Sequence, residues 1–291
     1  MSPTPALPPG VAFAVIELRF EPVVHLGGLS VPLQAIGLAV AILLALLLFA
    51  RAARRRLGPL PSGDLAFIVL GAIPGAVVGG RLVHGLVYAD AYALRPASLL
   101  DLGHGSLSLA GAVVGGAITA GYVASRLGRR VGALADAAAV PLLVAIGLGK
   151  VAMLLGGAGQ GVPWNGRGAI AFLGDGPWAS ADPATPAEPT QLMEGAWALL
   201  GIPVVAWIGR RLDRSGRGDR GLALLAAGAW WLLGRAAVAV WWRDRAILGP
   251  WGPEGVIALV LALGCLAAIA FGSRSGTPRT PSPQPDAARA S

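Results

Sequence analysis

Long apolar stretches, separated by short connections rich in arginine or in glycine and proline, make up most of the chain. A helix that crosses the hydrocarbon core of a bilayer needs about 20 mostly apolar residues. Seven stretches meet this condition, and they cover residues 30–50, 65–88, 107–125, 134–155, 192–208, 222–242 and 255–271. The pattern therefore predicts an all-α integral membrane protein with seven transmembrane helices.

Composition agrees with a membrane protein. Of the 291 residues, 55% are hydrophobic and 13% are charged, whereas charged residues make up about a quarter of a soluble protein. The single cysteine, Cys265, allows neither an internal disulfide nor a CxxC metal or redox site, and we expect it to serve packing. The three histidines are scattered and lack metal-ligand spacing, so we expect no metal and no cofactor.

The arginines orient the predicted helices. Fifteen of them lie in the connections 51–62, 126–131 and 210–220 and in the tail after residue 271, and five lie in the connections on the other side. Connections rich in arginine and lysine face the cytoplasm. We therefore expect the N-terminus outside and the C-terminus in the cytoplasm. Topology then explains the net charge of +8, and we expect no nucleic-acid partner.

This topology divides the chain into three parts. Residues 1–29 form an outer N-terminal segment, which has no basic region ahead of a short apolar core and is not expected to be a cleaved signal peptide. Residues 30–272 form the seven-helix membrane domain, with a large outer loop at 157–190. Residues 273–291 are polar and rich in proline, so we expect a disordered cytoplasmic tail that buries no core.

Ionisable side chains inside the predicted helices mark a candidate site. Lys150, the only lysine of the chain, lies in an apolar stretch, and an ionised group at such a position indicates a functional site with a partner. At 1.5 Å per helical residue, Arg81, Lys150 and Arg235 lie about 8–10 Å from the outer ends of their helices. Glu194 begins the fifth helix on the same side. Four helices thus place three cations and one carboxylate in the outer half of the bilayer.

Cations just below the outer headgroups suit an anionic phospholipid that enters sideways from the membrane, because arginine binds phosphate oxygens in pairs and lysine acts as a point charge. Arg243 would lie at the mouth of this site, and Gln191 shares a helix face with Glu194. Two simpler interpretations stay open: each cation reaches the nearby interface separately, or Glu194 is only a structural counter-ion. His84, one turn from Arg81, is either a base or a structural histidine.

Two further features concern the ends of the helices. Trp241, Trp242 and Trp251 are typical of an outer aromatic belt. Asp136, near the inner end of the fourth predicted helix, is expected to face one of the arginines at 129–130.

The order of several motifs resembles the prolipoprotein diacylglyceryl transferase family over residues 20–272. The matching segments are LGGLSVPLQAIGLAVAI (26–42), AIPGAVVGGRLVHGLVY (72–88), GHGSLSLAGAVVGG (103–116), DAAAVPLLVAIGLGKVAMLLGGAGQG (136–161) and EPTQLMEGAW (188–197). This resemblance implies a seven-helix enzyme of the bacterial plasma (inner) membrane. The family moves diacylglycerol from phosphatidylglycerol to the lipobox cysteine of a preprolipoprotein.

The chain departs from the family pattern at several motif positions. The family's histidine in the Ser-x-His-Gly-Gly segment corresponds to Ala110, and its signature arginine corresponds to Lys150. Its two asparagines and its glutamate correspond to Met153, Gly156 and Ala158, and the histidine and tyrosine of the fifth-helix motif correspond to Glu188 and Met193. Phosphate recognition is thus retained, whereas the usual proton acceptor is absent.

The resemblance implies transfer of diacylglycerol from an anionic phospholipid to a preprolipoprotein cysteine. In that reaction Lys150, Arg235, Arg243 and His84 are the expected catalytic residues, with His104 as a second candidate base. Substrate binding is expected from Arg81, Lys150, Gln191 and Glu194. The alternative is a non-catalytic relative that binds anionic lipid or the lipoprotein precursor as a scaffold or regulator. A transporter would show helices broken at the midplane and an internal repeat, and the sequence shows neither.

Overall fold

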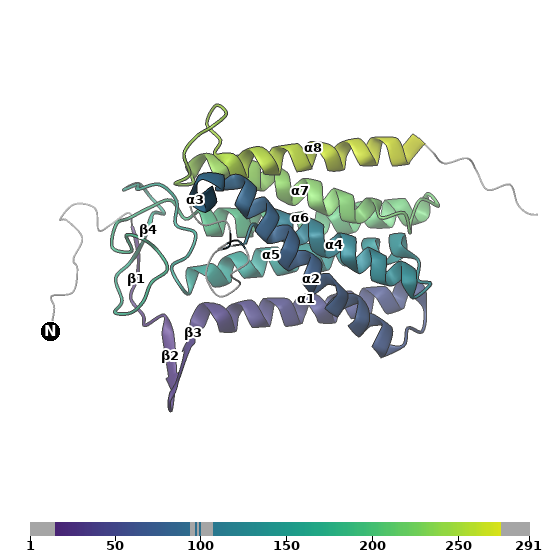
Figure 1. Cartoon of the computed structure of the whole chain (residues 1–291), viewed down its shortest axis with the longest axis horizontal. Coiled ribbons are helices and arrows are strands. Elements are labelled where there is room, and N and C mark those ends of the chain that lie inside the picture. Colours follow the sequence, from purple (N-terminus) through teal and green to yellow (C-terminus); the bar gives the residue numbers. More distant parts are fainter. Residues whose placement is uncertain (1–14, 94–96, 98, 100–106, 275–291) are drawn as a thin grey trace, which may run out of the picture.

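The computed structural model describes residues 15–93, 97, 99 and 107–274 of the chain (Figure 1). Within them, seven long helices run side by side (Figure 1), and each corresponds to one predicted stretch. They are α1 (Leu33–Leu57), α2 (Ser62–Val87), α4 (Leu109–Arg126), α5 (Val131–Leu154), α6 (Thr190–Arg214), α7 (Leu222–Val238) and α8 (Pro253–Arg274). Two short helices, α3 (Ala89–Ala93) and η2 (Ala239–Trp241), follow α2 and α7.

Six of the long helices are long and apolar enough to cross a membrane: α1, α2, α5, α6, α7 continued by η2, and α8. The helix outside this group is α4, which has 18 residues. The chain is therefore a multi-pass membrane protein. His104, residues 1–14 and most of the predicted disordered tail at 273–291 lie outside the described residues. Residues 273 and 274 belong to α8, so helix continues into the segment predicted as tail.

Two helices are longer at their basic ends than the sequence suggested. Helix α1 continues through Arg51–Arg56 to Leu57, and α6 continues to Arg214, so these arginines belong to helices and not to loops. Basic side chains stabilise the last turn of a helix because they face the negative end of its dipole. Hydropathy alone misses such extensions, since it measures how apolar a segment is. The helical hydrogen bonds continue into the polar segment that follows.

Helix α5 is central to the bundle. It packs against α1 on one side and against α6 and α7 on the other, while α8 packs on α7. Helix α2 packs closely on α4 through facing glycines, with Gly75 and Gly79 opposite Gly111 and Gly115. Small residues allow two membrane helices to approach until their backbones touch.

Gly115→Ala is expected to destabilise the protein by about 1–3 kcal/mol, the usual cost of overfilling a packed site. A Cβ at this position would overlap the carbonyl oxygen of Gly75, which belongs to the backbone and has no room to move. Gly63→Ala, in the first turn of α2 and with open space around it, is the matched control. Thermal unfolding of the purified variants in detergent measures the difference, and equal melting temperatures would contradict this account of the α2–α4 contact.

Four short strands lie at the end of the bundle where α1 begins (Figure 1). Strand β1 (Ile16–Leu18) pairs in parallel with β4 (Ile170–Phe172). Strands β2 (Val23–Leu26) and β3 (Leu29–Pro32) form an antiparallel hairpin that leads into α1. The all-α prediction omitted these strands, and the pairing joins the N-terminal segment to the long loop 157–190. Each strand is too short for a hydrophobic alternation to stand out in the sequence.

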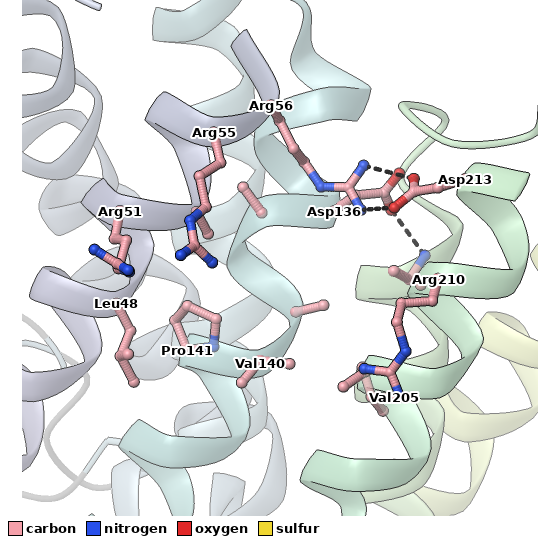
Figure 2. Close-up of a pocket in the computed structure, with 16 residues that line it drawn as sticks. Leu48, Arg51, Arg55, Arg56, Asp136, Val140, Pro141, Val205, Arg210 and Asp213 are labelled. Carbon is pink, nitrogen blue, oxygen red and sulfur yellow. Dashed lines mark hydrogen bonds and ion pairs between the residues drawn. The ribbon is translucent and has the colours of Figure 1, made fainter. Parts of the chain in front are cut away.

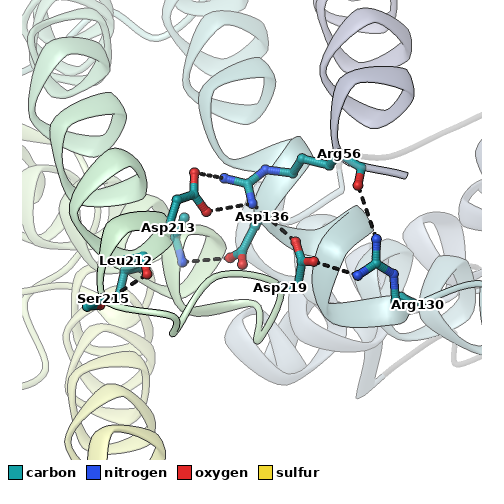
Figure 3. A network of polar contacts seen from close by, with 8 residues as sticks. Arg56, Arg130, Asp136, Leu212, Asp213, Ser215 and Asp219 are labelled. Carbon is teal, nitrogen blue, oxygen red and sulfur yellow. Dashed lines mark hydrogen bonds and ion pairs between the residues drawn. The ribbon is translucent and has the colours of Figure 1, made fainter. Parts of the chain in front are cut away.

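The opposite end of the bundle carries a network of arginines and aspartates (Figure 3). Arg56 of α1 donates to Asp213 of α6 at 2.9 and 3.0 Å and to Asp219 at 3.2 Å. Arg130 donates to the other oxygen of Asp219 at 2.8 Å. These contacts tie the basic ends of α1, α5 and α6 together.

The prediction that Asp136 faces Arg129 or Arg130 was wrong. Its Oδ1 accepts a hydrogen bond of 2.8 Å from the backbone N–H of Ala223, in the first turn of α7. Arg129 pairs with Asp64 instead, and Arg130 pairs with Asp219. The first N–H groups of a helix have no partner within it, so a buried carboxylate from a neighbouring helix satisfies one of them.

Candidate functional site

Four buried charged side chains from four helices meet near the strand-bearing end of the bundle. Lys150 of α5 lies 2.8 Å from Oε2 of Glu194 on α6. Arg235 of α7 donates to Oε1 of Glu194 at 3.0 Å and to Oε2 of Glu254 on α8 at 2.9 Å. Each of the four residues is at most 7% exposed. We call these four residues the ion cluster.

The ion cluster changes the charge balance that the sequence suggested. Glu194 is the counter-ion of both Lys150 and Arg235, and Glu254 is a second carboxylate that was not predicted. Glu254 was missed because the predicted helix began at residue 255, which placed it in a loop. The available signal was Pro253–Glu254, since proline at the first helical position followed by an acidic residue is typical of a helix N-terminus.

Aromatic side chains complete the walls of the ion cluster. The ring of Trp242 lies 4.5 Å from Cζ of Arg235 and 5.2 Å from Nζ of Lys150. Trp231 donates from Nε1 to Glu194 at 3.3 Å. The belt prediction was therefore wrong for Trp242, because its ring face attracts the two buried cations. Trp241 is 40% exposed, as expected of a belt residue.

Unsatisfied polar atoms lie beside the ion cluster. Gln191, one turn before Glu194 on α6, is 1% exposed, and neither Nε2 nor Oε1 has a hydrogen-bond partner among the described residues. Nε of Arg235 is also buried and has no hydrogen-bond partner among the described residues. A buried polar group without a partner costs about 1–3 kcal/mol. These atoms can offer donors and an acceptor to a bound polar ligand.

Arg243 connects the site to the long loop 157–190. Its Nε donates to the carbonyl oxygen of Gly161 at 2.7 Å, and a terminal nitrogen donates to Oε1 of Gln160 at 3.3 Å. Gln160 in turn donates from Nε2 to the carbonyl oxygens of Ile170 and Thr185. The loop 157–190 is therefore anchored to the arginine that follows Trp242.

Arg81 and His84 lie on α2, which approaches the site from another side. Arg81 is 5% exposed, and Nδ1 of His84 lies 3.0 Å from the hydroxyl oxygen of Tyr92. The His84 ring lies 4.7 Å from the Tyr88 ring, centroid to centroid, and the Tyr88 hydroxyl contacts Asp244 in the segment that carries Arg243. The structure therefore groups Lys150, Glu194 and Arg235 by direct contact and places Gln191, Arg243 and His84 around them.

Tyr88 and Asp244 join the end of α2 to the segment after η2. The Tyr88 hydroxyl donates to Oδ1 of Asp244 at 3.3 Å. Burial, together with the negative charge of Asp244, raises the pKa of Tyr88 to about 12. Burial also raises the pKa of Asp244, although the hydrogen bond from Tyr88 opposes this.

Asp244→Asn is expected to raise the melting temperature at pH 8 and to leave it nearly unchanged at pH 4. The pKa of this carboxyl in the folded protein lies above its value of about 3.9 in the unfolded chain. Ionising Asp244 above that pKa therefore costs stability, which asparagine avoids. Melting curves of both proteins at the two pH values test this, and a lower melting temperature of the variant at pH 8 would contradict it.

Two of the positions that depart from the family pattern, Ala110 and Gly156, are closely packed. Ala110 on α4 is 0% exposed and belongs to the main hydrophobic core. A Cβ at Gly156 would overlap Oε1 of Gln34 on α1. Neighbouring side chains therefore occupy the space that larger residues would need here.

Comparisons with known proteins agree with this architecture. The sequence profile described as prolipoprotein diacylglyceryl transferase matches residues 21–271. Among curated proteins, the chain is 31% identical over 217 residues to one from Frankia alni, which covers 72% of this chain and 55% of that protein. It is 30% identical over 200 residues to one from Synechococcus elongatus, which covers 65% of this chain and 64% of that protein. Both relatives are named phosphatidylglycerol–prolipoprotein diacylglyceryl transferase.

A third relative with the same name, from Frankia casuarinae, is 29% identical over 274 residues, which covers 89% of this chain and 63% of that protein. The chain thus spans 55–64% of the length of these three relatives.

Proposed function

Because the chain belongs to the prolipoprotein diacylglyceryl transferase family, we propose that it transfers diacylglycerol from phosphatidylglycerol, or another anionic phospholipid, to the lipobox cysteine of a preprolipoprotein. The observation that carries this proposal is the ion cluster, with the amide of Gln191 beside it, which has no hydrogen-bond partner among the described residues. Such a site offers cations and hydrogen-bond donors to a phosphate at the depth of a lipid headgroup.

The main task of the site in this reaction is to stabilise the negative charge that develops on the leaving phosphate, and no covalent intermediate with the protein is required. The cysteine thiolate attacks the glycerol carbon of the diacylglycerol part, so a carbon–sulfur bond forms. The bond between this carbon and the phosphate oxygen breaks, and glycerol phosphate leaves with the electron pair. Charge develops on the leaving phosphate, and donors fixed in advance around it lower the barrier.

Lys150 and Arg235 supply these donors in the proposed site. Lysine carries three N–H donors and arginine five. Contacts with Glu194 and Glu254 use only part of them, and Nε of Arg235 is buried without a partner among the described residues. Glu194 and Glu254 therefore act as positioning residues, because a carboxylate repels a phosphate. Arg243 and Arg81 add cations around the headgroup, and Gln191 binds a phosphate or glycerol oxygen.

The thiol needs a proton acceptor, and His84 is the candidate among the described residues. It lies one turn from Arg81 on α2 and beside Tyr88, whose hydroxyl contacts Asp244. A free thiol with a pKa near 8.5 is already a few per cent ionised at pH 7. Nearby cations lower a thiol pKa further, so a modest base is sufficient.

The proposed setting is the bacterial plasma membrane. We propose that α4 is the seventh span, that the strands and the ion cluster lie on the outer side, and that the arginine network faces the cytoplasm. The positive-inside rule supports this orientation. Residues 1–29 and 157–190 then lie outside, residues 30–272 form the membrane domain, and the tail after it is cytoplasmic.

The decisive experiment supplies this gene to bacterial cells depleted of their own diacylglyceryl transferase. Mass spectrometry of a lipoprotein then detects diacylglyceryl-cysteine, and Lys150→Met at equal expression serves as the inactive control. Absence of the modified cysteine while the protein is present in the membrane would refute the transferase. That outcome would favour a non-catalytic relative that binds lipid or precursor, an alternative supported by Ala110, a buried core residue at the position of the family's histidine.

Gln191→Leu is expected to raise thermal stability while weakening phospholipid binding and transfer. Leucine removes two buried polar atoms that have no partner in the described part of the chain, and each such group costs about 1–3 kcal/mol. A purely structural glutamine would instead lower the melting temperature when replaced. Melting curves and phosphatidylglycerol titrations of the same preparations separate the two cases.

A further inference from the structure

A cavity with a partly polar lining lies at the other end of the bundle from the ion cluster. It has a volume of about 520 Å³ and opens between α1, α5 and α6. Asp136 lines it, and this residue precedes Lys150 by 14 positions on α5, which corresponds to about 21 Å along the helix. The two sites therefore lie near opposite faces of the membrane.

Arginines dominate the rim of the cavity. Figure 2 shows Arg51 and Arg55 on α1 at one side and Arg210 on α6 at the other, with Pro141 of α5 between them. Within the part of the chain that the structure describes, the side chains of these three arginines form neither a hydrogen bond nor an ion pair. The fourth, Arg56, is held by Asp213 and Asp219. The cavity thus presents, from two facing helices, three guanidinium groups that no described residue contacts through a hydrogen bond or an ion pair.

The floor of the cavity is apolar. Leu48 on α1, Val140 and Pro141 on α5, and Val205 on α6 line it. Leu48 and Val205 precede Arg51 and Arg210 in their helices, so they lie nearer the middle of the membrane. A cationic rim above an apolar floor matches a molecule with an anionic head and hydrocarbon chains.

Asp136 adds a second requirement. This residue is 6% exposed, and the N–H of Ala223 occupies its Oδ1. Its Oδ2 is buried and has no hydrogen-bond partner within the residues that the structure describes. A buried carboxylate oxygen in this condition accepts from a donor on a ligand, such as a hydroxyl or an ammonium group.

We propose that this cavity is a second phosphate-binding site, occupied by the phosphate of a phospholipid headgroup or by a free phosphate ion. Arg51, Arg55 and Arg210 bind the phosphate oxygens, since paired guanidinium N–H groups match their geometry. Asp136 accepts a hydrogen bond from a headgroup hydroxyl or ammonium, and the apolar floor receives the upper part of the acyl chains. The site requires no transfer chemistry, so it stands whether or not the proposed function holds.

The test counts phospholipids bound to the purified protein in detergent by native mass spectrometry. Phosphatidylglycerol and phosphatidylethanolamine are titrated separately, and inorganic phosphate is added as a competitor. Arg55→Gln with Arg210→Gln removes two charges from the cavity. Arg54→Gln with Arg214→Gln removes two exposed charges from the same helix ends without lining it, and is the matched control.

The double variant Arg55→Gln/Arg210→Gln, the cavity pair, is expected to weaken the binding of one lipid about tenfold or more. The loss of a single hydrogen bond to a charged group already weakens binding by about that factor. The control pair should leave binding within about twofold, because Arg54 and Arg214 do not line the cavity and an exposed charge away from the ligand contributes little. If the unmodified protein binds two lipids and the cavity pair binds one, both sites bind lipid. If the unmodified protein binds one lipid and the cavity pair binds none, only this cavity binds lipid. Binding of inorganic phosphate that depends on Arg55 and Arg210, without lipid, identifies the free ion as the occupant.

Gly209→Leu tests the shape of the cavity while its charges stay constant. Gly209 lines the cavity, and a Cβ there meets open space, so the helix tolerates the change. The leucine side chain is expected to fill the floor of the cavity. It should therefore weaken the binding of the same lipid that the cavity pair loses. The proposal is overturned if the cavity pair and the control pair bind lipid and phosphate equally, or if both pairs lose binding to the same extent.

Discussion

Glu194→Gln is expected to destabilise the folded protein by about 3–5 kcal/mol, the usual cost of removing one partner from a buried ion pair. Glu194 is fully buried and is the counter-ion of both Lys150 and Arg235. Glutamine preserves its size and leaves two cations facing one remaining carboxylate, Glu254. Thermal unfolding in detergent, followed by tryptophan fluorescence, measures the loss together with the yield of protein from membranes.

The exposed pair of Glu21 and His25 provides the control. Both side chains are 59% exposed, so Glu21→Gln is expected to change stability by less than about 1 kcal/mol. Adding Lys150→Met to Glu194→Gln should restore part of the lost stability, because one of the two uncompensated cations is removed. A strictly additive double variant would show that the ion pair contributes no coupling, and the account of the ion cluster would then be wrong.

Lys150→Met is expected to reduce diacylglyceryl transfer about 10²–10³-fold, the effect of removing one donor that stabilises a developing anion. Methionine retains the length and apolar stem of lysine but provides neither charge nor donor. Arg235 still pairs with Glu194 and Glu254 in this variant, so the fold should persist with a smaller loss than that of Glu194→Gln. Transfer to a synthetic lipobox peptide in detergent, measured at saturating phosphatidylglycerol, gives the rate.

Lys150→Arg distinguishes the need for charge from the need for this side chain. The family's signature position carries arginine, and a guanidinium provides a paired contact to phosphate in addition to the charge. The variant is therefore expected to retain transfer at or above the level of the unmodified protein. Full activity of Lys150→Met, at equal amounts of folded protein, would remove Lys150 from the proposed mechanism.

Much of the secondary structure followed from the sequence because the signals are local. Each long apolar stretch became a helix, since the length needed to cross a bilayer and the absence of charges are properties of one segment. The departures have local causes as well. Helices α1 and α6 continue through arginines that hydropathy assigned to loops. The four strands are too short to produce a recognisable pattern.

The candidate site was predictable only in part. Depth along a helix can be read from the sequence, and Lys150, Glu194 and Arg235 do lie in contact. The rotation of each helix about its axis cannot be read in this way, so the partner of a charge stays open. Trp242 was assigned to the interface and instead covers two cations. Glu254 was assigned to a loop and instead begins α8.

By itself, the sequence determined that the chain is a helical membrane protein, which side of it is basic, and which family its motifs resemble. These properties depend on composition, on the length of apolar segments and on the order of short motifs. The tertiary structure alone decided that Glu194 and Glu254 neutralise Lys150 and Arg235, that Asp136 satisfies the start of α7, and that arginines of α1 and α6 share one cavity. Each of these contacts joins residues from different helices, and their meeting depends on how whole helix faces pack. A charge buried in the membrane is costly without a partner, and its partner comes from another helix.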